Sequence, residues 1–216
     1  EQVTLNVGVN AQVLTLNNSW ALEPRAGIKW QFSPKSSFAL AYGLHSRMEK
    51  MDVYFVKTQG TGDRSVNKDL GFTRAHHVML SYGFKISDNM NMKIEPYFQQ
   101  LYDVPVIADS SYSVLNRRDF YVENALVNRG KGRNIGVDIT LERYLNKGLY
   151  YMMTASIFDS KYYGGDRKWR NTLYNRNFIV NVLGGKEWMV GRDKQNMFSV
   201  NFKITLQGGD RYAPVD

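Results

Sequence analysis

Apolar and polar residues alternate through most of this chain, and this alternation restricts the fold more than any other feature. In the stretch 135–142 the odd positions hold Ile, Val, Ile and Leu, whereas the even positions hold Gly, Asp, Thr and Glu. The stretch 198–207 repeats the pattern, with Phe, Val, Phe, Ile and Leu at its even positions. Because successive side chains of a β-strand point to opposite faces, each stretch predicts a strand with one apolar and one polar face.

The same period of two recurs along the chain and predicts long antiparallel strands. The nine predicted strands are Gln2–Leu16, Arg25–Phe32, Ser37–Arg47, Phe72–Ile86, Asn91–Val104, Gly132–Tyr144, Leu149–Ser160, Asn177–Val190 and Met197–Gln207. Most of them exceed the roughly 5 to 6 residues that are usual in soluble sheets. They match or exceed the roughly 9 to 11 residues that a tilted strand needs to cross a bilayer.

The connections between these strands alternate between tight turns and long loops. The tight turns are 33–36, 87–90, 145–148 and 191–196. The long loops are 48–71, 105–131 and 161–176, with a shorter one at 17–24. Outer-membrane barrels have this asymmetry, with short turns in the periplasm and long loops outside the cell. We therefore expect an all-β, antiparallel, up-and-down transmembrane β-barrel.

The composition is consistent with this class and excludes several others. With 43% hydrophobic and 13% aromatic residues, the chain has too much apolar surface for a disordered protein. Its mean hydropathy of −0.43 excludes a helical membrane protein, whereas barrel strands face lipid with only every second residue. The chain has no cysteine, so disulfides and cysteine-bound zinc need no consideration.

The strand number predicts an incomplete barrel. Nine strands that begin in the periplasm end outside the cell, whereas single-chain bacterial barrels have an even number of strands. We expect residues 1–216 to form a single domain, a partial barrel whose closing strands are missing, with further strands at least beyond Asp216.

Several sequence strings resemble a known family. They are Leu22–Trp30, Phe38–Ser46, Phe158–Gly164, Arg170–Phe178, Leu183–Trp188 and Gly208–Asp216. Their order and spacing are similar to those in the β-barrel of TonB-dependent outer-membrane receptors, especially the type with a carboxypeptidase-regulatory-like N-terminal domain. The resemblance implies a roughly 22-stranded barrel that is closed by a plug domain. It also implies the bacterial outer membrane as location, and the import of a bulky solute driven through TonB. The chain contains neither a plug domain nor a TonB box, so these partners would act through other regions.

Residues that could carry chemistry are few. His76 and His77 are neighbours in a predicted strand, so their rings point to opposite faces and are poorly placed to share a metal ion. Gly184 and Gly185 interrupt another predicted strand, which indicates a bulge or a close approach of strands. We predict no catalytic residue, no cofactor and no metal site, and expect that the protein is not an enzyme.

The formal charge of +8 comes from basic residues that concentrate in the predicted outer loops. There they would meet lipopolysaccharide, an acidic solute or only water. Nucleic acid is not an expected partner, because no nucleic-acid-binding module accompanies the charge. The candidate loop contacts for an imported solute are Arg117, Arg118, Tyr162, Tyr163 and Trp169.

Two other functions remain open at this point. A soluble all-β binding module, such as a carbohydrate-binding sandwich, would use the aromatic loops as its site. It would need shorter strands, and it would not explain the alternation of loop lengths. A passive porin-like barrel would have the same strands without energy coupling.

Overall fold

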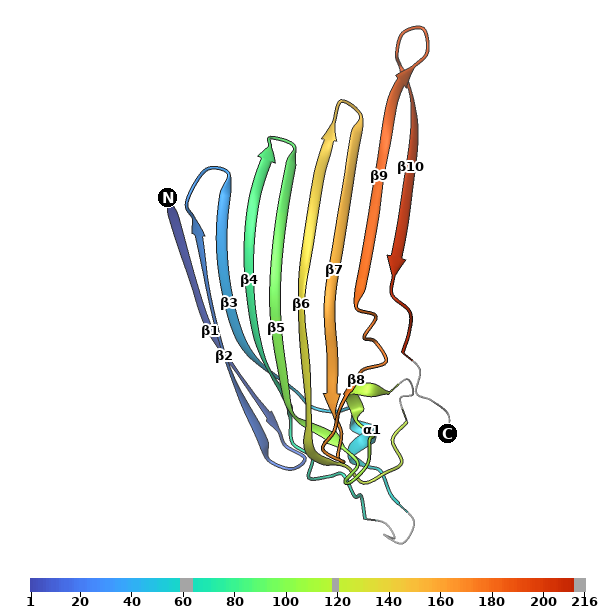
Figure 1. The fold of residues 1–216 in the computed structure, drawn as a ribbon. Coiled ribbons are helices and arrows are strands. Elements are labelled where there is room, and N and C mark those ends of the chain that lie inside the picture. The colour runs from blue at the N-terminus through green and yellow to red at the C-terminus, as the bar shows by residue number, and fades with distance from the viewer. Residues whose placement is uncertain (59–63, 118–120, 212–216) are drawn as a thin grey trace.

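The computed structural model describes residues 1–58, 64–117 and 121–211. In this part of the chain ten strands form one antiparallel sheet, in which consecutive long strands lie side by side and β1 and β10 form the two edges (Figure 1). The strands are β1 Gln2–Leu14, β2 Ser19–Gln31, β3 Ser36–Arg47, β4 Thr73–Ser87, β5 Met90–Val106, β6 Val127–Asn146, β7 Leu149–Tyr163, β8 Trp169–Asn171, β9 Phe178–Val190 and β10 Asn196–Gln207. The sheet is an incomplete antiparallel β-barrel, which confirms the predicted fold class.

The nine long strands have 12 to 20 residues, and each corresponds to a predicted strand. The additional strand, β8, has three residues and pairs with the end of β7 inside the predicted loop 161–176. The nine long strands therefore have the length that is needed to cross a bilayer.

The start of β2 differs from the prediction. Most of the predicted loop 17–24 is strand, because β2 begins at Ser19 after a tight turn in which Asn18 has a φ of 58°. Pro24 is paired with Val9 of β1, and the pairing of β2 with β3 starts only at Arg25. Proline cannot donate a backbone hydrogen bond, and here β3 requires none from it.

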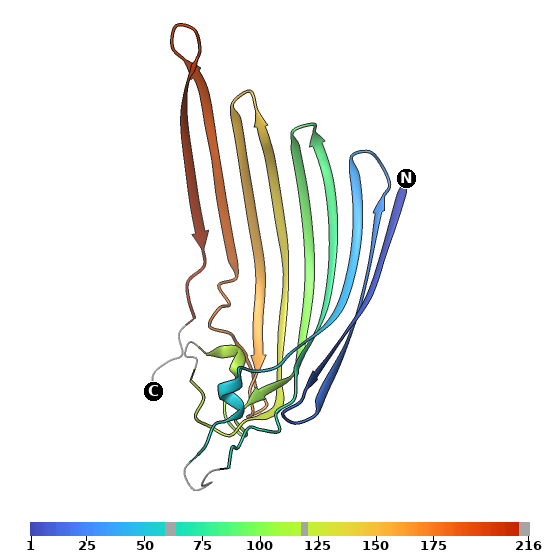
Figure 2. The same cartoon turned by 180° about the vertical axis from the view of Figure 1, so that it is seen from behind.

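The two ends of the sheet carry connections of different length, as the sequence predicted. All the tight hairpin turns except the one at Asn18 lie at one end, and the long loops lie at the other (Figures 1 and 2). The long loops carry α1 (Met51–Tyr54) and η1 (Val114–Asn116). Val53 and Tyr54 of α1 pack in a core with Leu14 and Ala21 of the first hairpin. No helix in the described ranges is long and apolar enough to cross a membrane.

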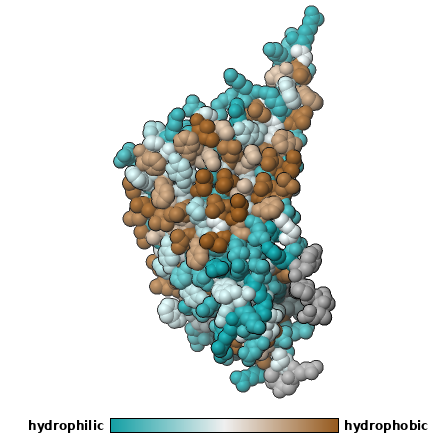
Figure 3. All heavy atoms as spheres, in the orientation of Figure 1, coloured by the Kyte–Doolittle hydropathy of each residue, from teal (hydrophilic) through white to brown (hydrophobic). Residues whose placement is uncertain are grey.

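The two faces of the sheet separate apolar from polar side chains. Val137, Ile139 and Leu141 of β6 are paired in register with apolar residues on both sides, for example Ile139 with Ile94 of β5 and Ala155 of β7. Ile135, nearer the long loops, is paired with Phe98 of β5 and Asp159 of β7. Figure 3 shows the result as an apolar band across the strands, with hydrophilic side chains on both sides of it. We call the face that carries Ile139 the lipid face, and the opposite face, which carries Asp138 and the other intervening positions, the lumen face.

Surface labelling of whole cells tests this orientation. Cysteines introduced at Asp69 and Ser111, which are exposed in the long loops, should react with a membrane-impermeant maleimide. Cysteines at Lys35 and Arg192, which are exposed in the tight turns, should react only after the outer membrane is permeabilised. Labelling of intact cells at the turns but not at the loops would show that the orientation is inverted.

Candidate functional site at the long-loop end of the barrel wall

A row of polar side chains crosses the lumen face near the long loops. The row begins at Thr172, whose hydroxyl donates to Ser160 Oγ at 3.0 Å, and Ser160 in turn donates to Asn134 Oδ1 at 2.6 Å. Asn134 Nδ2 donates to Gln99 Oε1, and the Gln99 amide nitrogen donates to Nε2 of His77. β4, β5, β6 and β7 each contribute one residue to this row, and these residues are in register on adjacent strands: His77, Gln99, Asn134 and Ser160. Such a connected row fixes its side chains in place and presents polar atoms to the lumen.

A second polar centre lies on the first three strands of the lumen face. Glu23 is 1% exposed, and its carboxylate accepts four hydrogen bonds. Its donors are the side chains of Asn10 at 3.1 Å, Gln12 at 2.6 Å and Arg25 at 2.8 Å, together with the Ser46 backbone N–H at 2.8 Å. A buried carboxylate that is satisfied in this way holds strands together and has no free oxygen for a ligand.

A cavity of about 450 Å³ opens beside the polar row, under η1. His45, Glu49, Thr73 and Gln99 line it together with the apolar side chain of Leu115. Burial raises the pKa of Glu49 above its ordinary value, although nearby arginines oppose the shift. The cavity thus combines apolar surface with hydrogen-bonding groups, a combination that is typical of small-molecule sites.

The histidines lie in two different environments. The rings of His45 and His77 are 4.7 Å apart on the lumen face. The His76 ring lies on the lipid face, where Nδ1 is 2.9 Å from the Tyr42 hydroxyl and the ring stacks on Tyr102 at 5.2 Å. The prediction that His76 and His77 point to opposite faces is therefore confirmed. The contact of His45 with His77 depends on the register of β3 and β4, which the sequence did not supply.

The structure separates the five candidate solute contacts. Tyr162 is buried and lies on the lumen face, whereas Tyr163 and Trp169 pack against each other on the lipid face, with ring centroids 5.4 Å apart. Arg117 follows η1, and Arg118 lies outside the described residues. Among the four candidates that the structure describes, Tyr162 lies on the lumen face and Arg117 directly follows η1, which covers the cavity.

Tyr163 and Trp169 belong to a basic aromatic cluster above the apolar band. The Lys131 ammonium lies 5.7 Å from the centre of the Tyr163 ring, and the Arg133 guanidinium lies 5.6 Å from that of Trp169. Both cations precede Ile135 of the apolar band on the lipid face of β6, toward the long loops. This cluster was not predicted, because it depends on the cross-strand register.

The loop after β7 is held by its own polar contacts. Arg170 donates two hydrogen bonds to the Asp166 carboxylate, at 2.9 and 2.6 Å, and this guanidinium lowers the pKa of Asp166. Asn175 is fully buried and donates to Asp159 and Asn171, each at 3.0 Å. Among the described residues, no group of three His, Cys, Asp or Glu side chains could hold a metal ion.

Comparisons with known proteins identify the type of barrel through the fold alone. No protein-family model matches the sequence, and no curated protein sequence matches it. The FrpB iron transporter from Neisseria meningitidis superposes with a TM-score of 0.60 at 14% identity over 94% of this chain. The ferric-catecholate import receptor Fiu from Escherichia coli K12 gives 0.58 at 9% identity over 82%, and the siderophore receptor PiuA from Acinetobacter baumannii gives 0.54 at 14% over 88%.

The matched proteins are TonB-dependent outer-membrane receptors. The chain spans 31% of the FrpB chain, 23% of Fiu and 29% of PiuA. Its fold is therefore that of part of the barrel in such a receptor, which confirms the predicted barrel type. The predicted location, the outer membrane, is the location of these receptors.

Proposed function

We propose that this chain forms part of the wall of a TonB-dependent outer-membrane receptor, and that the whole receptor imports a bulky solute. The observation that carries the proposal is the barrel sheet itself, with its apolar band on one face and a polar row with an adjoining cavity on the other. Residues 1–216 act as a single partial-barrel domain, which supplies wall and solute contacts but no catalytic group.

The solute class that we propose first is an iron chelate. The three similar structures are an iron transporter, a ferric-catecholate import receptor and a siderophore receptor. The cavity that His45 and Gln99 line offers both hydrogen bonds and apolar surface, which suits a chelate with an organic ligand shell.

The partners follow from the two faces and the two edges of the sheet. The plug domain would occupy the lumen beside the polar row, and TonB would act through that plug. The edges of β1 and β10 would pair with further strands of the barrel, because an unpaired strand edge is not stable within a bilayer. On the lipid face, the cluster of Lys131, Arg133, Tyr163 and Trp169 would contact lipopolysaccharide, whose phosphates and sugars suit cations and aromatic rings.

The alternatives have less support. A soluble sandwich would cover its apolar face with a second sheet, whereas in the described residues one sheet exposes Val200, Phe202 and Ile204. An enzyme is not supported, because the similar structures are receptors and transporters. A passive porin shares the barrel wall and is distinguished from a receptor by energy coupling.

Uptake measurements on the full-length protein test the proposal. Iron-starved cells that carry the gene should accumulate a radiolabelled ferric catecholate, and deletion of TonB should reduce this accumulation to the level of cells without the gene. Gln99→Ala breaks the polar row and should slow uptake about fivefold, because one hydrogen bond contributes about 1 kcal/mol.

Gln100→Ala is the matched control, because Gln100 is the next residue of β5 and donates to backbone carbonyls on the lipid face. Its uptake should equal that of the wild type. Uptake that persists without TonB would indicate a passive porin-like barrel. Import of another solute but not of the iron chelate would refute the proposed solute class.

A further inference from the structure

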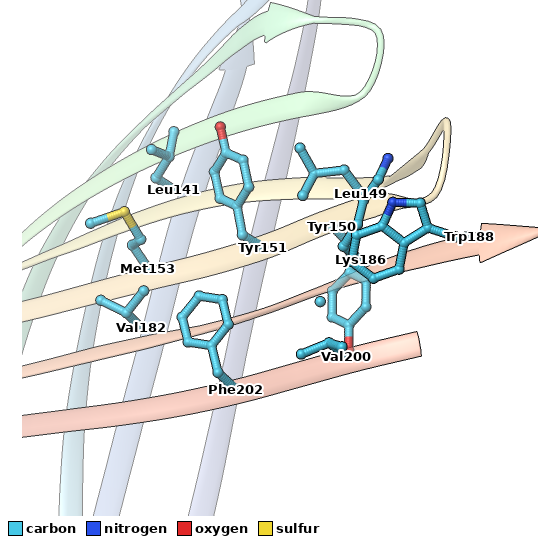
Figure 4. A pocket seen from close by; sticks show the side chains of 11 residues that line it. Leu141, Leu149, Tyr150, Tyr151, Met153, Val182, Lys186, Trp188, Val200 and Phe202 are labelled. Atoms are coloured by element: carbon cyan, nitrogen blue, oxygen red, sulfur yellow. The ribbon is translucent and has the colours of Figure 1, made fainter. Parts of the chain in front are cut away.

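An apolar groove crosses the lipid face near the tight-turn end of β6, β7, β9 and β10. It has a volume of about 430 Å³, which is within the roughly 300 to 1,000 Å³ of typical ligand pockets. Leu141, Tyr151, Met153, Val182 and Phe202 line one part of it (Figure 4). Leu149, Lys186, Trp188 and Val200 line the part nearer the turns, so only this end of the groove carries a charge.

The groove passes beside Gly184, whose two cross-strand partners line it. Gly184 is paired with Tyr151 on one side and with Phe202 on the other, so two aromatic residues flank a position without a side chain. A Cβ at Gly184 would lie 3.1 Å from Tyr151 Cβ and 3.3 Å from Phe202 Cε1, which is a tight contact. The pairing of β9 with β10 shows no register shift, so this glycine marks a close approach of strands and not a bulge.

The charged end of the groove has the character of a headgroup site. The Lys186 ammonium donates to the Lys147 carbonyl in the adjacent turn, at 2.7 Å, and Trp188 stacks on Phe198 beside it. Arg143 lies opposite Tyr151 on the lipid face, and its Nε is buried without a hydrogen-bond partner. Within the described part of the chain, neither Lys186 nor Arg143 forms an ion pair. The Lys186 ammonium, which lines the groove, can therefore bind an external anion.

We propose that this groove binds one anionic glycerophospholipid of the inner leaflet, with an acyl chain along Val182 and Phe202 and the phosphate at Lys186. Tight turns face the periplasm in outer-membrane barrels, so the groove lies in the leaflet that contains phospholipid. Cations beside an apolar groove at the membrane interface favour anionic headgroups, and the flanking Trp and Tyr rings belong to the same interface. The inference rests on the proposed membrane placement.

Native mass spectrometry of the full-length receptor tests the proposal. The receptor is extracted from outer membranes in mild detergent and titrated with palmitoyl-oleoyl phosphatidylglycerol. The wild type should retain one tightly bound lipid. Lys186→Gln should weaken its binding about fivefold, the effect of one basic side chain near an anionic membrane surface. Val182→Trp, which fills the groove, should abolish the tight binding.

Two variants outside the groove serve as controls. Lys203→Gln makes the same charge change on the lumen face of β10, and Ile157→Trp makes a similar volume change elsewhere on the lipid face of β7. Both should bind lipid like the wild type. Equal binding in all variants, an equal loss in the controls, or lipopolysaccharide as the retained lipid would each overturn the proposal. Absence of the receptor from the outer-membrane fraction would instead refute the proposed function, so the two failures are distinguishable.

Discussion

Replacing Ile139 by Arg in the intact barrel is expected to lower the free energy of unfolding by about 2 to 4 kcal/mol, the cost of a cation at the midplane of a bilayer. Ile139 lies within the apolar run 135–141 on the lipid face of β6, between Ile94 and Ala155 of the neighbouring strands. Its side chain therefore faces hydrocarbon at a depth where water cannot reach an arginine without deforming the lipid.

Denaturant titration of the full-length barrel, refolded into lipid vesicles, measures this effect. Thr140→Arg is the matched control, because Thr140 is the next residue of the strand and lies on the lumen face. Thr140→Arg should lower the free energy of unfolding by less than about 1 kcal/mol, since a lumen-facing cation stays hydrated. Equal losses for both variants would show that the two faces are wrongly assigned.

The strands and their faces could be predicted because both depend on local sequence. The alternation at 135–142 and 198–207 requires no knowledge of a neighbouring strand, and both stretches lie in strands with the predicted lipid face. The start of β2 could not be predicted, because Pro24 indicates a break. Whether a proline is tolerated depends on the neighbouring strand, and β3 pairs with β2 only beyond it.

The candidate site was predicted less well, because it depends on register. Tyr162, Tyr163 and Trp169 are close in sequence and were grouped, yet the alternation of β7 places Tyr162 on the lumen face and Tyr163 on the lipid face. The pairing of β8 with β7 then places Trp169 beside Tyr163. The polar row joins His77, Gln99 and further residues of adjacent strands, which only the strand pairing brings together. Local sequence thus predicts the faces of single strands, whereas a site formed by several strands requires their register.

Truncating Glu23 to Ala should lower the free energy of unfolding of the intact barrel by about 2 to 3 kcal/mol, because buried donors are left without an acceptor. The reason lies in the pairing of β2 with β3, which stops at Arg25 and Gly43 while β3 continues to Arg47. Beyond this point the Ser46 N–H has no carbonyl of β2 to bind, and the Glu23 carboxylate takes that place. The same carboxylate binds Gln12 of β1 and so joins three strands where their ladder ends.

The same denaturant titration checks this prediction, with Glu142→Ala as its control. Glu142 is also a carboxylate on the lumen face, but it forms no hydrogen bond or ion pair with the described residues and should lose less than about 0.5 kcal/mol. The loss of unfolding free energy for Glu23→Gln should lie between those for Glu23→Ala and Glu142→Ala. The amide keeps one acceptor for the Ser46 N–H, but its NH₂ group faces the Asn10 and Arg25 donors. A loss for Glu23→Ala as small as that for Glu142→Ala would mean that the backbone of β3 finds another acceptor. The structure beyond the last paired residues of β2 and β3 would then not depend on this carboxylate.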